Sequence, residues 1–160
     1  PFAKITSEQW TKTMDVNLGG VFNTYQATLA SMKDAKWGRM IAIASTAGLK
    51  GYPYVSSYCA SKHGVLGLTK SLSLELAKTG ITVNAICPGF TETPMLEQSI
   101  AKITGQTGMS DEDARSALCQ SNPMGRFIQP DEISETVLWL CKNASSSITG
   151  QAISISGGEI

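Results

Sequence analysis

The chain has 160 residues, with 13 Lys plus Arg against 13 Asp plus Glu, and a formal net charge of zero at pH 7. Balanced charge removes the electrostatic basis for nucleic-acid binding, so we expect no nucleic-acid partner. No long uninterrupted apolar run and no charged-then-apolar leader occur, so we expect neither a membrane span nor a signal peptide. The length fits one domain.

The cysteines do not indicate a metal site. Four of them lie at wide separations without a CxxC pair, and the chain has a single histidine, His63. A zinc site needs clustered Cys and His ligands, so we expect no metal. Reduced thiols are typical of cytoplasmic proteins, and we expect that location.

The first predicted element is a helix over residues 7–33. Thr6 or Ser7 can cap its start, and Glu8 in the first turn complements the helix dipole. Its apolar side chains recur at intervals of three and four residues and form one stripe, consisting of Met14, Leu18, Val21, Phe22, Tyr25, Leu29 and Met32.

Short apolar runs without polar alternation predict buried parallel strands. They lie at residues 39–44, 81–87 and 152–156, and Pro88-Gly89 should end the second of them. Further helices are expected at 56–78, 95–103, 110–120 and 131–142, with a flexible joint at 104–108. Gly80 is expected to supply the left-handed residue that ends the helix over 56–78.

Helices and strands that alternate in this way predict crossover units of a parallel α/β sheet. Ligands of such sheets bind beyond the carboxyl ends of the strands. Those ends fall at Ser45, Pro88-Gly89 and Gly157, so the functional site should lie there.

Tyr58 and Lys62 stand four residues apart at the start of a predicted helix and therefore share one face. An ammonium group close to a phenol favours its ionised form. Ser45 ends the preceding strand and can point at the same crevice, where its hydroxyl could hold a carbonyl oxygen. These residues suit the proton transfers of an acid/base centre.

Several motifs in order resemble the short-chain dehydrogenase/reductase family. They are Asn17-Leu18-Gly19-Gly20, Ser45, Tyr58-Cys59-Ala60-Ser61-Lys62, Asn84-Ala85-Ile86-Cys87-Pro88-Gly89 and Ile148-Thr149-Gly150-Gln151 with Gly157-Gly158. The resemblance implies a Rossmann-like, doubly wound parallel sheet and a catalytic set of Asn17, Ser45, Tyr58 and Lys62. The tyrosine would be the general acid/base and the serine would orient the carbonyl. The lysine would assist the tyrosine and hold the nicotinamide ribose, while the asparagine backbone would anchor a water.

The same resemblance implies NAD or NADP as cofactor, held by Tyr58, Lys62, Pro88, Gly89, Thr91 and Thr93. Thr91 departs from the isoleucine or valine usual in the family, and because the family contact there is made by the backbone, we expect that contact to survive. The segment 91–122 would form a substrate lid. Several motifs look like those of 3-oxoacyl and polyketide ketoreductases and of 3-hydroxybutyrate dehydrogenases.

We therefore expect an oxidoreductase that moves hydride between NAD(P)(H) and a secondary alcohol or ketone, with a 3-hydroxyacyl or 3-oxoacyl substrate. A homodimer or homotetramer through the two long helices is expected. The alternative is a catalytically inactive fragment that serves as an oligomerisation scaffold. A serine hydrolase using Ser45 and His63 lacks a nucleophile elbow and is set aside.

The family's glycine-rich turn, its residue that selects NAD or NADP and its NNAG segment have no counterpart here, and the chain begins with Pro1. We therefore interpret residues 1–160 as a single partial Rossmann domain, the C-terminal two thirds of a longer chain. The sequence does not decide between the two cofactors.

This interpretation predicts that intact-mass spectrometry of the natural protein will give a mass well above the 17.0 kDa of these residues. A longer chain is expected because three strands alone leave a sheet edge that should pair with further strands. A measured mass of 17.0 kDa would contradict the expectation and favour the scaffold.

Overall fold

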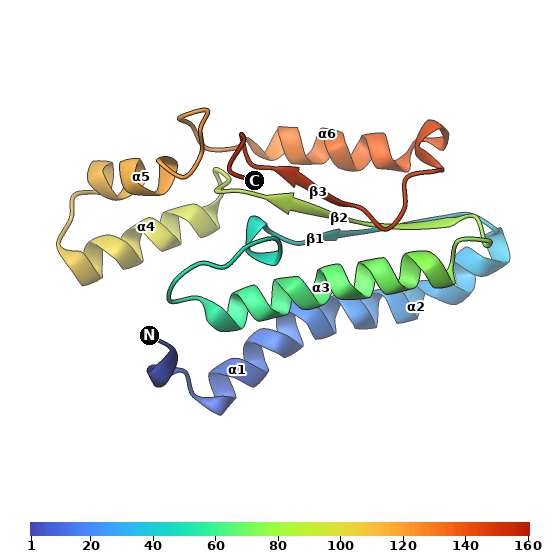
Figure 1. Cartoon of the computed structure of the whole chain (residues 1–160), viewed down its shortest axis with the longest axis horizontal. Helices are drawn as coiled ribbons and strands as arrows, with labels where there is room; N and C mark the ends of the chain where they lie inside the picture. Colours follow the sequence, from blue (N-terminus) through green and yellow to red (C-terminus); the bar gives the residue numbers. More distant parts are fainter.

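A parallel sheet with helices on both faces organises the chain (Figure 1). The computed structural model describes all residues, 1–160. Strands β1 (Gly38–Ile43), β2 (Ile81–Pro88) and β3 (Ala152–Ile155) are parallel and lie in the order β1-β2-β3. Every residue of the central strand β2 is buried, as its continuous apolar run predicts. The predicted parallel α/β sheet is therefore confirmed.

The helices fall close to their predicted positions, with some corrections. The expected helix over 7–33 is a rod interrupted by a π-helical turn, Asp15–Gly19, and it continues to Ala35. Thr6 caps it through the backbone N–H of Gln9, as predicted for one of its two candidate caps. The helical elements are α1 (Ser7–Met14), α2 (Gly20–Ala35), α3 (Ser56–Glu75), α4 (Pro94–Thr107), α5 (Asp111–Cys119) and α6 (Pro130–Cys141).

Two expectations about helix ends were wrong. Helix α4 runs through Gly105 to Thr107, so there is no flexible joint at 104–108, and Gly108 with φ +73° ends the helix instead. Helix α3 already ends at Glu75. Gly80 does have a positive φ of +79°, but it serves the turn into β2, where a Cβ would overlap the carbonyl oxygen of Lys36.

The main core lies between the sheet and helices α2 and α3, while α6 covers the opposite face (Figure 1). Apolar side chains of the sheet meet those of α2 and α3 in it, and because α6 covers the other face, the strands carry no polar alternation. Its buried members are Tyr25, Met40, Ala42, Ala44, Val65, Leu66, Leu76, Ile81, Val83, Ala85 and Cys87. No helix combines the length and apolarity that a membrane crossing requires.

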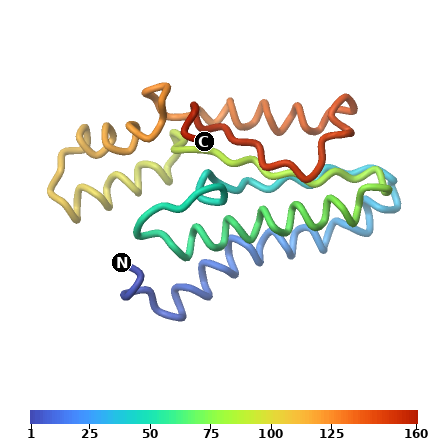
Figure 2. Tube along the Cα trace, in the orientation of Figure 1, coloured from blue at the N-terminus to red at the C-terminus, as the bar shows by residue number.

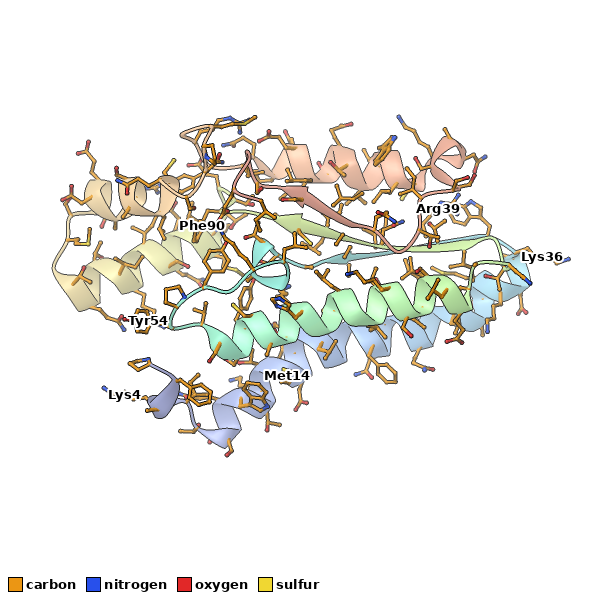
Figure 3. All side chains as sticks on the ribbon, in the orientation of Figure 1. Lys4, Met14, Lys36, Arg39, Tyr54 and Phe90 are labelled. Carbon is orange, nitrogen blue, oxygen red and sulfur yellow. The ribbon has the colours of Figure 1, made fainter.

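Helices α4 and α5 form a separate unit beyond the carboxyl ends of the strands (Figure 2). A small cluster of buried side chains, Leu96, Ile100 and Ala114, joins them, and Phe90 packs against it where the chain leaves β2 (Figure 3). Arg115 on α5 also forms an ion pair with Glu97 on α4. This arrangement leaves the segment 91–122 attached to the sheet mainly at its two ends.

The turn after β1 approaches α3 very closely, and this contact yields a testable prediction. Gly48 is buried, and a Cβ built on it would lie 2.9 Å from the backbone oxygen of Lys62. Replacing Gly48 by Ala should lower the free energy of unfolding by about 1–3 kcal/mol, because backbone atoms must shift to admit the methyl group. Urea unfolding measures the change.

Gly51→Ala is the matched control, because a Cβ at Gly51 has no neighbour within 4 Å. It should leave the free energy of unfolding nearly unchanged. Equal stabilities of the two variants would show that the close approach at Gly48 is not required.

Candidate active site

Ser45 lies directly beyond β1, at the carboxyl edge of the sheet. Its hydroxyl oxygen accepts a hydrogen bond from the backbone N–H of Ala47 at 3.1 Å and so caps the 3-10 turn Thr46–Gly48. The backbone N–H of Ser45 lies close enough to the Cys87 thiol on β2 to oppose, in part, the rise that burial causes in the pKa of that thiol. Ser45 thus lies between the ends of β1 and β2, at the edge of the sheet where the sequence predicts a ligand site.

Tyr58 and Lys62 lie on the first turns of α3 and share one face. The Lys62 Nζ atom is 5.6 Å from the centroid of the Tyr58 ring. It donates a hydrogen bond of 2.9 Å to the carbonyl oxygen of Ile43, the last residue of β1. The ammonium group therefore joins the Tyr58 ring to the end of the strand that leads to Ser45.

The surroundings of Lys62 are short of compensating charge. Burial lowers the pKa of Lys62 below its ordinary value, and the nearby Cys87 opposes this shift weakly. Burial in turn raises the pKa of the Cys87 thiol, against the smaller effects of the Ser45 N–H and the Lys62 charge. An ammonium has three N–H donors, and only one of them is used within the chain. Lys62 can therefore bind further oxygen atoms.

Asn17 lies within the π-helical turn and reaches α3. Its Nδ2 donates to the hydroxyl oxygen of Ser61 at 3.1 Å, and that hydroxyl donates to the backbone oxygen of Tyr58 at 2.8 Å. Ser61 is fully buried, so both bonds are shielded from water. No sequence pattern predicted this role for Ser61, although its position directly before Lys62 was an available signal. π-Helical turns are frequent at functional sites, and this one coincides with Asn17.

The predicted cofactor segment leads from β2 to α4. Pro88 is the last residue of β2 and does not lie outside the strand as expected, because the strand pairs it with Ile155. The N–H of Gly89 bonds to the oxygen of Ile155 at 2.9 Å. The Thr91 hydroxyl donates to Gly89 O, and the Thr93 hydroxyl donates to Thr91 O. The segment is thus fixed by its own backbone and hydroxyl bonds.

A second polar group beside this site was not predicted. The carboxylate of Glu159 forms an ion pair with Lys50 and accepts a hydrogen bond from the Tyr52 hydroxyl. Burial and the bond to Glu159 raise the pKa of Tyr52, so this hydroxyl stays protonated. Residues 107 positions apart are joined here, and no local pattern signals such a contact. No group of three or more His, Cys, Asp and Glu side chains is placed to hold a metal.

The buried ammonium group predicts a pH-dependent stability. At pH 7 a Lys62→Met variant should be at least as stable as the wild type, because the variant does not bury a charge. The Ile43 carbonyl loses its bond to Lys62, but water can reach it at the half-exposed end of β1. At pH values between the lowered pKa of Lys62 in the folded chain and its ordinary pKa in the unfolded chain, the unfolded chain binds more protons than the folded one. Wild-type stability should therefore rise relative to the variant as pH increases.

Urea unfolding of both proteins at pH 7 and at about pH 9.5 measures this convergence, since lysine normally titrates near 10.4. Lys70→Met, at an exposed position of the same helix, is the control and should show no such trend. A Lys62→Met variant that is less stable at pH 7, with a difference independent of pH, would contradict the assignment.

Known proteins resemble this chain over almost all of its length. The family model described as Enoyl-(Acyl carrier protein) reductase matches residues 1–159. D-beta-hydroxybutyrate dehydrogenase of Rhizobium meliloti is 38% identical over 152 residues, which cover 94% of this chain and 59% of the relative. The 3-oxoacyl-(acyl-carrier-protein) reductase of Thermotoga maritima is 39% identical over 155 residues, 97% of this chain and 58% of the relative.

A solved structure gives the same result. A variant of actinorhodin polyketide ketoreductase with NADPH superposes with a TM-score of 0.93 at 41% identity, over 99% of this chain and 62% of that chain. The chain thus spans about 60% of the length of the relatives it matches. These matches and the parallel sheet agree with the resemblance carried by the sequence motifs, and Tyr58 and Lys62 lie on α3 as those motifs predict. The chain belongs to the short-chain dehydrogenase/reductase family.

Proposed function

We propose that the whole protein transfers a hydride between NAD(P)(H) and a secondary alcohol or ketone. The observation that carries this proposal is the position of the Lys62 ammonium, 5.6 Å from the centroid of the Tyr58 ring and bonded to the end of β1 beside Ser45. A cation placed in this way favours proton exchange by a tyrosine. A 3-hydroxyacyl or 3-oxoacyl compound is the proposed substrate, because relatives named as reductases and dehydrogenases of such compounds match the chain.

In the reduction direction, the Ser45 hydroxyl donates a hydrogen bond to the substrate ketone oxygen and orients it. The Tyr58 hydroxyl gives its proton to this oxygen, and Lys62 stabilises the negative charge left on the phenol. When bound, NAD(P)H supplies the hydride that the carbonyl carbon receives. Asn17 positions the start of α3 through Ser61, and its backbone would anchor a water that resupplies the proton.

The residues present suit a dinucleotide. Lys62 keeps free N–H donors in a partly buried setting, which fits the hydroxyl groups of a ribose. Tyr58 lies on the same face. Pro88 ends β2, and Gly89, Thr91 and Thr93 follow it at the carboxyl edge, where parallel sheets bind nucleotides. We propose these side chains and their backbone as the nicotinamide side of the cofactor site.

We propose that residues 91–122 close over the substrate. Leu96 and Ile100 are buried in the cluster that joins α4 to α5, whereas Met95 is 69% exposed at the start of α4. The inward residues thus hold the two helices together, and Met95 remains available to an apolar part of the substrate. A flexible Met side chain adapts to acyl chains of different shape.

We also propose a cytoplasmic homodimer or homotetramer assembled through α2 and α3. These helices leave a hollow between them that is lined by Leu18, Phe22, Gly64 and Leu68 among others. Phe22 is 48% and Leu74 is 81% exposed, which are high values for large apolar side chains on a helix pair. A scaffold without activity would use the same surface, so activity must decide between the two functions.

Tyr58→Phe tests the enzyme function. The change removes only the hydroxyl, so turnover of an acetoacetyl thioester should fall by about 10²–10⁴-fold, the usual contribution of a general acid. The dissociation constant for NADPH or NADH should change little. Consumption of the reduced cofactor and quenching of tryptophan fluorescence measure the two quantities in the full chain.

Tyr54→Phe is the matched control, because Tyr54 is 79% exposed on the loop before α3 (Figure 3). It should retain wild-type turnover. If Tyr58→Phe keeps a tenth of the wild-type rate, Tyr58 is not the general acid. Cofactor binding without turnover of any 3-oxoacyl or 3-hydroxyacyl compound by the wild type would favour the scaffold.

A further inference from the structure

A buried carboxylate lies where the loops after the strands meet. The side chain of Glu159, which follows β3, is 2% exposed. Its Oε1 atom is 2.8 Å from the Lys50 ammonium and accepts a hydrogen bond from the Tyr52 hydroxyl. Lys50 and Tyr52 both belong to the loop between β1 and α3. One acidic side chain thus holds two residues of a loop more than a hundred positions away.

The bonds continue from Glu159 to the turn that carries Ser45. Because the Tyr52 hydroxyl donates its hydrogen bond to Glu159, it accepts a hydrogen bond from the hydroxyl of Thr46, at 2.7 Å. Thr46 is buried and directly follows Ser45. Lys50 also lies over the Tyr52 ring, with Nζ 4.9 Å from its centroid, which holds the ring from a second side.

The third loop of the site meets the same carboxylate. A Cβ built on Gly89, after β2, would lie 3.2 Å from Glu159 Oε2, so a side chain there would press on the carboxylate. The loops that follow β1, β2 and β3 therefore converge on Glu159. Two of them carry proposed site residues, Ser45 on one and Gly89 on the other.

We propose that Glu159 is a positioning residue that fixes the loop 45–55 and thereby the substrate side of the active site. A buried carboxylate requires partners, and removing it takes away the acceptor of the Tyr52 hydroxyl and the counter-charge of the half-exposed Lys50. The loop then loses the bond that ties Tyr52, and through it Thr46, to the segment after β3, one residue from the hydroxyl that orients the ketone. The proposed effect of Glu159 on turnover rests on the proposed function, whereas its effect on the position of the loop does not.

The test compares Glu159→Ala and Glu159→Gln in the full chain. Glu159→Ala should lower kcat/KM for an acetoacetyl thioester on the order of 10- to 100-fold, as expected when reacting groups lose their alignment. Glu159→Gln should recover part of this loss, because its amide oxygen still accepts from Tyr52. The dissociation constant of NADPH should stay within about twofold, since the Glu159 side chain bonds to Lys50 and Tyr52 and makes no bond to the proposed cofactor segment.

Hydrogen exchange gives a readout that does not depend on activity. Backbone amides of residues 46–52 should exchange faster in Glu159→Ala than in the wild type, and at intermediate rates in Glu159→Gln. Glu135→Ala, at an exposed position on α6, is the control and should change neither exchange nor turnover. If Glu159→Ala does not fold, Tyr52→Phe removes the same bond while keeping the ring.

The outcomes separate the two proposals. Unchanged exchange of the 46–52 amides in Glu159→Ala or Tyr52→Phe overturns the anchoring of the loop. Faster exchange with unchanged kcat/KM overturns the positioning role. A wild-type protein that binds cofactor but turns over no 3-oxoacyl or 3-hydroxyacyl compound counts against the proposed function, and the exchange data still decide whether Glu159 holds the loop.

Discussion

The close approach of α3 to the carboxyl end of β1 determines the arrangement of the candidate site. Gly48 lies against the backbone of Lys62, and the Lys62 ammonium bonds to the oxygen of Ile43 at 2.9 Å. A larger residue at Gly48 would push the helix outward and carry Tyr58 away from Ser45. The buried parallel sheet provides the fixed base for this contact, because β1 pairs with β2 along its whole length, including its carboxyl end.

The position of Lys62 that suits the proposed chemistry also lowers the stability of the fold. Lys62 is placed where burial disfavours its charge, and no carboxylate in the chain compensates it. In contrast, the buried Glu159 is compensated by Lys50 and Tyr52. Enzymes often keep such unsatisfied groups at sites of chemistry and lose stability by doing so. The difference between the two groups agrees with a ligand-binding role for Lys62 and a positioning role for Glu159.

Local patterns in the sequence predicted the strands, the parallel sheet and the shared helix face of Tyr58 and Lys62. These features depend on periodicity and on residues close in the chain. The sequence did not predict the π-helical turn at Asn17, the continuation of α4 through Gly105 or the bonds of Glu159. No residue type has a clear propensity for a π-helical turn, so the sequence carries no signal for it. In α4, packing against α5 outweighs the low helix propensity of one glycine. Glu159 meets Tyr52 only after the strands assemble.

The most direct test of the account is a crystal structure of the full-chain Tyr58→Phe variant with NADPH or NADH and a 3-oxoacyl thioester. The variant should hold the substrate without converting it. In this crystal the ketone oxygen should lie within hydrogen-bonding distance of the Ser45 hydroxyl and face the ring of residue 58. A ketone bound away from Ser45 and from the start of α3 would contradict it.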